Sequence, residues 1–476
     1  MNHFDKINYI YFLGIGGIGM SALARYFNLL GKKVYGYDLT PSALTQSLES
    51  EGIEIVYNDD ISLIPMNCMA QKEKTMVVFT PAVPQDNKIF GYFAGNRYFM
   101  IKRARVLGMI SDKYNLIAVS GTHGKTTTSS VIANILRCHS EDSFAFLGGI
   151  SKNLDSNLMM PKNKEAFENP ETLLVAEADE FDRSFLWLTP RVSVITYVDA
   201  DHLDIYKDRA DLIATFNSFA QKGKKDGAVI VNKKIEELID TKGIKKIIYS
   251  EDDKTADYYA ENLRLEDGFF IIDAVTPKGV IKDIKIGARG RVNIENTMAC
   301  IAATQLSGID DSTIKKGVET FMGVKRRMDF HVQTSDAVYI DDYAHHPREL
   351  SATISSVREL FPGKKITGIF QPHLYTRTRD FATDFAKSLD LLDEVVLMDI
   401  YPAREKPIVG VDSKLIAGLM KNKNTFLINQ KEKIIEKIVQ EKPQVLLTLG
   451  AGSIDRLIHP LKQALKKDES LKTENI

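Results

Sequence analysis

The sequence predicts an α/β protein of three domains with mostly parallel sheets. Short apolar strands alternate with helical patterns over nearly the whole chain, which is typical of α/β layers. The length of 476 residues suits about three domains of ~150 residues each. Two glycine-rich turns each follow an apolar strand and precede a helix, as phosphate-binding turns do. We therefore expect a Rossmann-like domain over residues 1–112, a central P-loop-type ATPase domain over 113–323 and a Rossmann-like α/β domain over 324–476.

The first expected strand, at 9–13, leads into a glycine-rich turn, here called the first loop (Gly14–Gly19), and a helix from about Gly17 to Leu30. Further strands are expected at 32–38, at 76–80 and within 97–107. The first loop has the G-x-G-x-x-G spacing of dinucleotide-binding turns, and an acid ends the next strand. The spacing alone leaves open a dinucleotide such as NAD, another diphosphate ligand, or a structural turn. The candidate binding residues are Gly14, Gly16, Gly17, Ile18, Gly19 and Asp38.

The second glycine-rich turn, here called the second loop (Gly121–Thr127), follows a strand expected within 111–121 and opens a helix that runs through Leu136. Backbone N–H groups at a helix start carry partial positive charge toward an anion. Lys125 adds a charge for the β- and γ-phosphates, and Thr126 offers a hydroxyl to Mg²⁺. Val119 stands where the usual G-x-x-x-x-G-K-[ST] loop has its first glycine. We predict that ATP binds here through Gly121, Thr122, His123, Gly124, Lys125, Thr126 and Thr127.

The remaining segments continue the α/β rhythm. The central domain is expected to hold strands at 172–179, 191–199 and 227–232, small antiparallel strands within 250–290, and a helix over 294–306. The third domain is expected to hold strands at 337–342, 365–372, 394–400 and 444–450.

Composition argues against several classes of function. The formal net charge of −1 favours neither a nucleic-acid partner nor an anionic membrane surface. No apolar run reaches the ~18 residues of a membrane span, and the N-terminus lacks the basic region of a signal peptide. Cys68, Cys138 and Cys300 fit no metal or disulfide spacing, as in a reduced cytosolic protein. We therefore predict a cytoplasmic protein, a monomer or a homodimer, without membrane insertion.

The segment "GTHGKTTT" resembles the ATP loop of the Mur ligase family, the ATP-dependent amide-forming enzymes of peptidoglycan synthesis. Other segments, in order, are similar to the members that attach L-alanine to UDP-N-acetylmuramate: "FLGIGGIGMSALA", "VAEADEFDRSF", "DADHLDIY", "DDYAHHP", "FQPHLYTRTRDF" and "IYPAREKPIVGV". The resemblance covers nearly the whole chain. It implies that the first domain binds the UDP part of the substrate, the second binds ATP with Mg²⁺ (two ions), and the third closes over the site with the amino acid.

The resemblance also implies roles for single residues. Glu177 would bind Mg²⁺ beside Thr126, and His202 would bind a second Mg²⁺. His123 is expected either to cap its turn or to contact the muramate carboxylate region, and Glu180 and Asp182 are expected to be solvated loop acids. The nucleotide would also contact Asn293, Asn296, Arg327 and Asp342. The amino-acid pocket would contain Tyr343, His345, His346, His373 and Arg377, and the catalytic residues would be Lys125, His202, Arg327 and His345.

The sequence departs from the family pattern in several places. Val292 replaces a usual histidine before Asn293, Leu374 replaces a usual arginine, and Met328 replaces a usual phenylalanine. The region of a carbamylated lysine reads Phe-Asn-Ser at 216–218, so we predict no such lysine. Three alternatives remain: a ligase that attaches whole peptides to UDP-N-acetylmuramate, an NAD-dependent oxidoreductase, and a binding protein with a decayed site. The oxidoreductase leaves the second loop unexplained, and the decayed site conflicts with the presence of Lys125, Thr126, Glu177 and His202.

Overall fold

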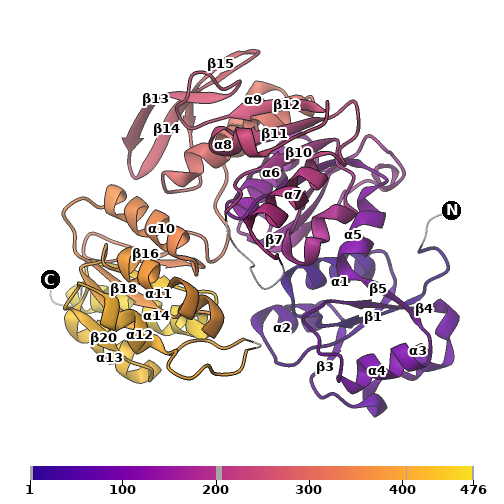
Figure 1. The fold of residues 1–476 in the computed structure, drawn as a ribbon, viewed down its shortest axis with the longest axis horizontal. Coiled ribbons are helices and arrows are strands. Elements are labelled where there is room, and N and C mark those ends of the chain that lie inside the picture. The colour runs from indigo at the N-terminus through magenta and orange to yellow at the C-terminus, as the bar shows by residue number, and fades with distance from the viewer. Residues whose placement is uncertain (1–3, 200–205, 404, 474–476) are drawn as a thin grey trace. The chain divides into compact units, whose positions relative to one another are not determined.

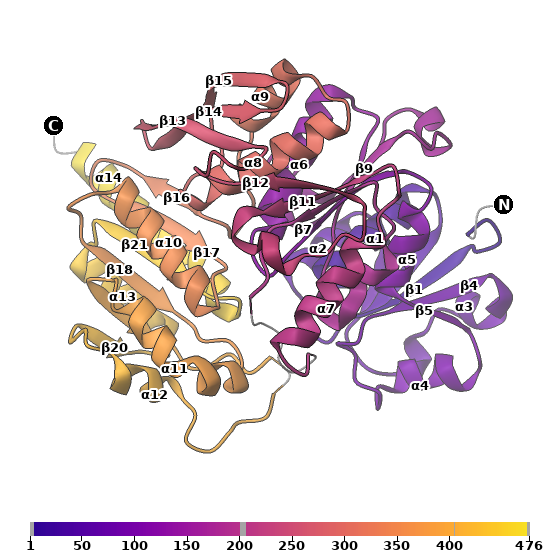
Figure 2. The same cartoon turned by 45° about the horizontal axis from the view of Figure 1, so that its top comes forward.

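The computed structural model describes residues 4–199, 206–403 and 405–473. The described residues form two compact units. The first unit runs to Arg264 and adds Ile271–Ala288 and Ile294–Met322, and the second comprises Leu265–Phe270, Arg289–Asn293 and the chain from Gly323 onward. Helices alternate with mainly parallel strands in both units, which confirms the predicted α/β class (Figures 1 and 2).

The first sheet has the strand order β3-β2-β1-β4-β5 with parallel neighbours, the order of a Rossmann-like domain. The strand expected within 97–107 ends at Lys102, and a helix begins at Arg103. Val106, Leu107 and Ile110 recur at helical spacing and are buried, which explains the change. The strands are β1 (Tyr9–Leu13), β2 (Lys33–Tyr37), β3 (Glu54–Val56), β4 (Thr75–Phe79) and β5 (Phe99–Lys102), and the helices are α1 (Ile18–Leu29), α2 (Ala43–Ser50), α3 (Met66–Ala70), α4 (Lys88–Gly95) and α5 (Arg103–Ser111).

The central sheet has the order β12-β11-β10-β6-β9-β7-β8 and is parallel except for the β7–β8 hairpin. Its middle strands are continuous apolar runs, as expected for parallel strands covered on both faces. The strands are β6 (Asn115–Ser120), β7 (Phe144–Ser151), β8 (Ser156–Met159), β9 (Leu173–Glu177), β10 (Val192–Ile195), β11 (Ala228–Asn232) and β12 (Lys245–Tyr249), and the helices are α6 (Lys125–His139), α7 (Arg209–Ala220), α8 (Val292–Leu306) and α9 (Asp311–Glu319). The hairpin was not predicted from the sequence.

A small separate sheet follows, with the order β13-β14-β15. Its strands are β13 (Tyr259–Glu266), β14 (Phe269–Thr276) and β15 (Gly279–Lys285), and β14 pairs with β15 in antiparallel fashion. Figures 1 and 2 show β15 beside α9. The expected antiparallel strands within 250–290 are therefore confirmed.

The C-terminal sheet has the order β16-β17-β21-β18-β19-β20, parallel apart from β16. Helices surround its buried strands (Figure 1). The strands are β16 (Asp329–Gln333), β17 (Val338–Asp342), β18 (Ile366–Phe370), β19 (Glu394–Leu397), β20 (Thr425–Leu427) and β21 (Val445–Leu449), and the helices are α10 (Pro347–Leu360), α11 (Tyr375–Leu389), α12 (Ser413–Leu419), α13 (Lys431–Glu441) and α14 (Ile458–Thr473). No helix in the described ranges is both long and apolar enough for a membrane span.

Helix α1 packs on the β7–β8 hairpin, so that the first and central sheets share one hydrophobic core. Tyr26 of α1 brings its ring to within 5.7 Å of the ring of Phe146 on β7, measured between centroids. Because α1 follows the first loop directly, this packing attaches the first loop to the sheet that carries the second loop.

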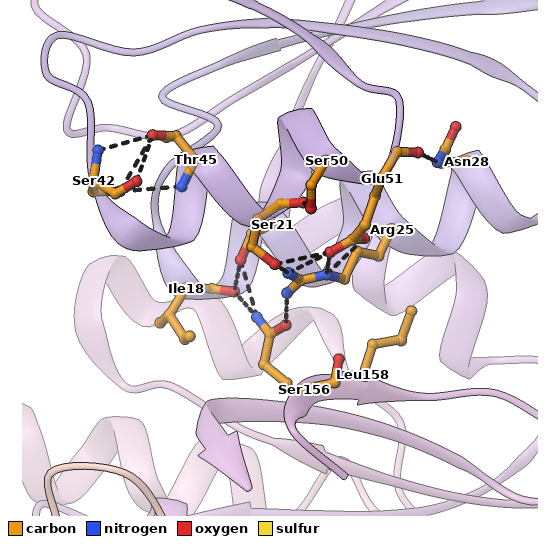
Figure 3. Close-up of polar contacts among 12 residues, drawn as sticks. Ile18, Ser21, Arg25, Asn28, Ser42, Thr45, Ser50, Glu51, Ser156 and Leu158 are labelled. Atoms are coloured by element: carbon orange, nitrogen blue, oxygen red, sulfur yellow. Dashed lines mark hydrogen bonds and ion pairs between the residues drawn. The ribbon is translucent and has the colours of Figure 1, made fainter.

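A buried polar network reinforces the same contact (Figure 3). The side-chain amide of Asn157 on β8 donates to the carbonyl oxygen of Ile18 at 2.6 Å and to the hydroxyl of Ser21 at 2.9 Å. Its oxygen accepts a hydrogen bond from Arg25 at 2.6 Å, and Arg25 forms an ion pair with Glu51 at 2.7 Å. Asn157 is fully buried, so breaking this network would leave buried polar groups without these partners.

Candidate active site

The second loop connects the end of β6 to the start of α6 in the first unit. Gly121 (φ 132°) and Gly124 (φ 81°) lie in the left-handed region that side chains disfavour. Gly124 is the N-cap of α6, and a Cβ on it would lie 2.7 Å from Oδ1 of Asn296 on α8. The loop therefore presents the positive end of a helix at the carboxyl edge of the central sheet, the arrangement that suits a phosphate.

Lys125 is surrounded by carboxylates. Its Nζ donates to the carbonyl oxygen of Gly121 at 2.6 Å and to Oε1 of Glu180 at 2.9 Å. The expectation that Glu180 is a solvated loop acid is wrong, because its side chain is 0% exposed and its charge is balanced by Lys125. Burial lowers the pKa of Lys125, but Glu180, Asp179 and Glu177 outweigh burial and raise the pKa above its ordinary value. Lys125 is therefore a permanent cation at the start of α6.

Glu177 and Thr126 supply oxygen atoms to the same region. Glu177 ends β9, and a Cβ on Gly148 of β7 would collide with its carboxylate. Thr126 is buried in the first turn of α6. Carboxylate and hydroxyl oxygens are suitable donors for Mg²⁺. Within the described residues no group of three or more His, Cys, Asp or Glu side chains could hold a metal, and His202 lies outside them.

His123 lies against the end of β10. Its Nε2 is 3.3 Å from Oδ2 of Asp199, and its carbonyl oxygen accepts a hydrogen bond from the hydroxyl of Thr196. The hydroxyl of Thr122 accepts a hydrogen bond from the backbone N–H of Asp199 at 3.2 Å. These contacts fix the loop to the neighbouring strand end, and the His123 ring contacts the Asp199 carboxylate.

The first loop joins β1 to α1 with Gly14 at φ 84° and Gly17 as the N-cap. Oδ2 of Asp38 accepts a hydrogen bond from the backbone N–H of Gly16 at 2.7 Å. In NAD-binding domains the corresponding acid binds a ribose hydroxyl. The Asp38 carboxylate here binds the loop itself, so this geometry gives no support to the NAD interpretation.

In the second unit, β17 ends in two buried acids. Asp341 forms an ion pair with Arg326 at 3.0 Å, and burial raises its pKa while Arg326 opposes the shift. Asp342 accepts hydrogen bonds from the backbone N–H groups of Met328 at 2.7 Å and Ala344 at 2.8 Å. Burial raises the pKa of Asp342 to about 6, against the effect of Arg327 and of these hydrogen bonds.

The adjacent arginines have different surroundings. Arg326 also donates to the carbonyl oxygen of Gly450 at 2.7 Å, which fixes it inside the fold. The side chain of Arg327 is 32% exposed and lies 3.9 Å from Glu349, measured between Nη1 and Oε1. Both guanidinium groups lie 5.2 Å from the centroid of the Tyr343 ring. Arg327 is therefore the more exposed arginine of this pair, since the Arg326 side chain is 20% exposed and bound to Asp341 and Gly450.

Several predicted amino-acid-site residues lie together near these arginines. The ring of His345 lies 5.3 Å from that of Tyr343 and 5.9 Å from that of His373, measured between centroids. The ring of His373 stacks on that of Tyr401, with 5.7 Å between centroids. Tyr401 was not among the residues predicted from the sequence. Nδ1 of His345 is 3.0 Å from the carbonyl oxygen of Tyr343 and 3.3 Å from Oε2 of Glu349.

Three other predicted residues of the second unit lie at the starts of helices. His346 is the N-cap of α10 and is buried, with its ring 5.0 Å from that of Phe381. Arg377 is half-buried in the first turn of α11. Leu374 precedes that helix with φ 73°, an unfavourable angle for leucine. Asn293 is buried at the start of α8 and donates to the carbonyl oxygen of Arg289 at 2.7 Å.

Family models match three successive segments of the chain. They are the Mur ligase family, catalytic domain (residues 9–115), the Mur ligase middle domain (119–304) and the Mur ligase, glutamate ligase domain (326–452). The chain is 48% identical over 464 residues to the UDP-N-acetylmuramate–L-alanine ligase of Parabacteroides distasonis, covering 97% of this chain and 98% of that protein.

Solved structures show the same similarity. The UDP-N-acetylmuramate-alanine ligase of Thermotoga maritima matches with a TM-score of 0.81 at 26% identity, covering 97% of this chain and 99% of that one. A murein peptide ligase of Psychrobacter arcticus matches with a TM-score of 0.68 at 22% identity, covering 96% and 98%. The second similarity concerns the fold alone.

Proposed function

The chain belongs to the Mur ligase family, and from this premise we propose that it joins L-alanine to the lactyl carboxylate of UDP-N-acetylmuramate with conversion of ATP to ADP and phosphate. The product, UDP-N-acetylmuramoyl-L-alanine, is a peptidoglycan precursor. The observation that carries the proposal is the 48% identity to such a ligase over 97% of the chain. Residues 1–112 would bind the UDP part, 113–323 ATP, and 324–476 the amino acid.

In the first step, the substrate carboxylate attacks the γ-phosphate of ATP, the bond to the β-phosphate oxygen breaks, and an acyl phosphate and ADP form. Two anions must approach each other, so the site must supply positive charge. Lys125, charged and at the start of α6, is suited to the β- and γ-phosphates. Arg327 would supply a second cation. Thr126 and Glu177 would hold Mg²⁺, which adds positive charge at the phosphates when bound; a second ion would involve His202.

In the second step, the amino group of alanine attacks the acyl carbon, and phosphate leaves. The amine must lose a proton, which a neutral histidine can accept. Nδ1 of His345 lies 3.0 Å from the carbonyl oxygen of Tyr343. Because a carbonyl oxygen can only accept a hydrogen bond, this contact favours the tautomer with its proton on Nδ1. Nε2 then carries the lone pair, so His345 is our candidate base. Arg377 would bind the alanine carboxylate, since arginine binds carboxylates through two parallel hydrogen bonds.

A phosphate-release assay with purified protein, ATP and Mg²⁺ tests the proposal. Release should require both UDP-N-acetylmuramate and an amino acid, and it should be fastest with L-alanine rather than glycine, L-serine or a cell-wall tripeptide. Lys125→Ala should abolish release, because it removes the cation at the phosphates. Preference for the tripeptide would instead favour the peptide-attaching ligase. Turnover that survives in Lys125→Ala would refute the assignment of the second loop.

A further inference from the structure

Arg103, the first residue of α5, lies between the first loop and the acidic segment that surrounds Lys125. A Cβ on Gly19 would lie 2.6 Å from Nη1 of Arg103 and 3.2 Å from its Cζ, so the guanidinium lies directly over that glycine. On its other side, Nη2 of Arg103 is 3.6 Å from Oδ2 of Asp179. The Arg103 and Asp179 side chains are 21% and 37% exposed, so both remain accessible to a ligand.

The bare backbone at Gly19 is what makes room for this guanidinium. In dinucleotide-binding turns the third glycine allows close packing of helix and strand. Here the atoms closest to the missing side chain belong to Arg103 instead. Gly19 lies in the first turn of α1, where backbone N–H groups favour an anion. The helix start and the arginine therefore place positive charge at the same end of the first loop.

The contact between Arg103 and Asp179 is loose for a structural ion pair. At 3.6 Å it exceeds the length of a charge-assisted hydrogen bond, and partly exposed pairs of this kind contribute little to stability. Oδ1 of Asp179 accepts a hydrogen bond from the backbone N–H of Phe181 at 3.1 Å, which keeps the carboxylate in place without Arg103. A ligand with phosphate oxygens offers the guanidinium shorter and paired contacts.

We propose that Arg103 is a substrate-binding residue that exchanges Asp179 for the diphosphate of the nucleotide-sugar substrate at the first loop. This inference rests on the proposed function. It places a side chain from α5, outside the glycine motif, in the diphosphate site. The Asp179 carboxylate, which lies beside Arg103, also stabilises the positive charge of Lys125 in the second loop.

Binding of UDP and of uridine, measured by isothermal titration calorimetry, tests the inference. Arg103→Gln should weaken UDP binding by roughly 10- to 100-fold, the effect of losing hydrogen bonds to a charged group. It should leave uridine binding unchanged, because uridine lacks phosphates. Arg105→Gln is the matched control: Arg105 lies on the same helix, packs 5.3 Å from the ring centroid of Trp187, and should affect neither ligand.

Asp179→Asn provides a second test that does not remove the arginine. It frees Arg103 from its competing carboxylate, so UDP should bind at least as tightly as to the unsubstituted protein. Three outcomes would each overturn the inference alone. In Arg103→Gln, these are equal weakening of UDP and uridine binding, or unchanged UDP binding. In Asp179→Asn, it is weaker UDP binding. Failure of the unsubstituted protein to bind UDP would overturn it together with the assignment of the first loop.

Discussion

The buried pair of Lys125 and Glu180 can be tested by stability, independently of catalysis. Lys125→Met keeps the aliphatic stem and removes the ammonium that lies 2.9 Å from Oε1 of Glu180. The two side chains are 14% and 0% exposed, so solvent screens the pair weakly. Removing one partner of a buried pair costs about 3–5 kcal/mol, because a buried charge loses its counter-charge. We therefore expect the variant to lose about that much stability.

The double variant Lys125→Met with Glu180→Gln separates the charge effect from packing. Replacing both partners by neutral groups of similar volume is often nearly neutral in stability. The double variant should therefore recover most of the stability that the single variant loses, while phosphate release stays absent in both. Lys162→Met is the matched control, because Lys162 pairs with Glu141 at 2.7 Å but the side chains are 67% and 62% exposed.

Calorimetric melting of the four proteins provides the measurement. At roughly 2 °C or more per kcal/mol, Lys125→Met should melt ~6 °C or more below the unsubstituted protein, and Lys162→Met close to it. A loss for Lys125→Met as small as that for Lys162→Met would refute the buried pair. So would a double variant no more stable than the single variant, since the loss would then come from packing rather than charge.

Three further predictions concern other parts of the fold. Asn157→Leu should lower the melting temperature and raise KM for UDP-N-acetylmuramate more than KM for ATP in steady-state assays, because it releases the first turn of α1. Gly148→Ala should displace Glu177 and raise the Mg²⁺ concentration that activity needs by ~10-fold or more, whereas Gly91→Ala, with open space around its Cβ, should not. Asp342 has a folded pKa of about 6, above its ordinary value, so its contribution to stability is present below pH ~4 and is lost as pH rises through 6. The melting temperature of Asp342→Asn should therefore rise progressively relative to that of the unsubstituted protein between pH 4.5 and 7.5. The corresponding gain in the free energy of unfolding reaches up to about 3 kcal/mol. A difference in melting temperature that stays constant over this pH range would contradict this.

Local sequence signals predicted where the helices after the first and second loops begin. Glycine spacing after an apolar strand set the helix starts, and α1 and α6 begin at Ile18 and Lys125, within a residue of the expectation. The positive φ angles of Gly121 and Gly124 are local features of the turn, so a short sequence motif is enough to predict them. The identification of the family rests on several such motifs in order along the chain.

Long-range partners were not predictable in the same way. Glu180 looks like a loop acid until the fold brings it to Lys125, which is 55 residues away in the sequence. Arg326 and Arg327 are adjacent and chemically identical, and their surroundings differ only through contacts that the fold makes: Arg326 binds Asp341 and the carbonyl oxygen of Gly450, and Arg327 lies near Glu349. The β7–β8 hairpin lacks a strong turn signal, yet it carries Asn157. The ion pairs of buried charges therefore become visible only in the folded structure, because their partners come from distant segments of the chain.

The two loops share one electrostatic design. The first loop engages the carboxylate of Asp38 through the backbone N–H of Gly16 at 2.7 Å, and the second engages Glu180 through Lys125 at 2.9 Å. Each carboxylate compensates positive charge that the loop would otherwise concentrate, which stabilises the loop geometry. An anionic ligand must compete with these internal acids, so weak monoanions gain little, whereas di- and triphosphates offer enough charge and oxygen atoms to replace them. We therefore expect selectivity for polyphosphates over single anions to depend on these acids as much as on the glycines.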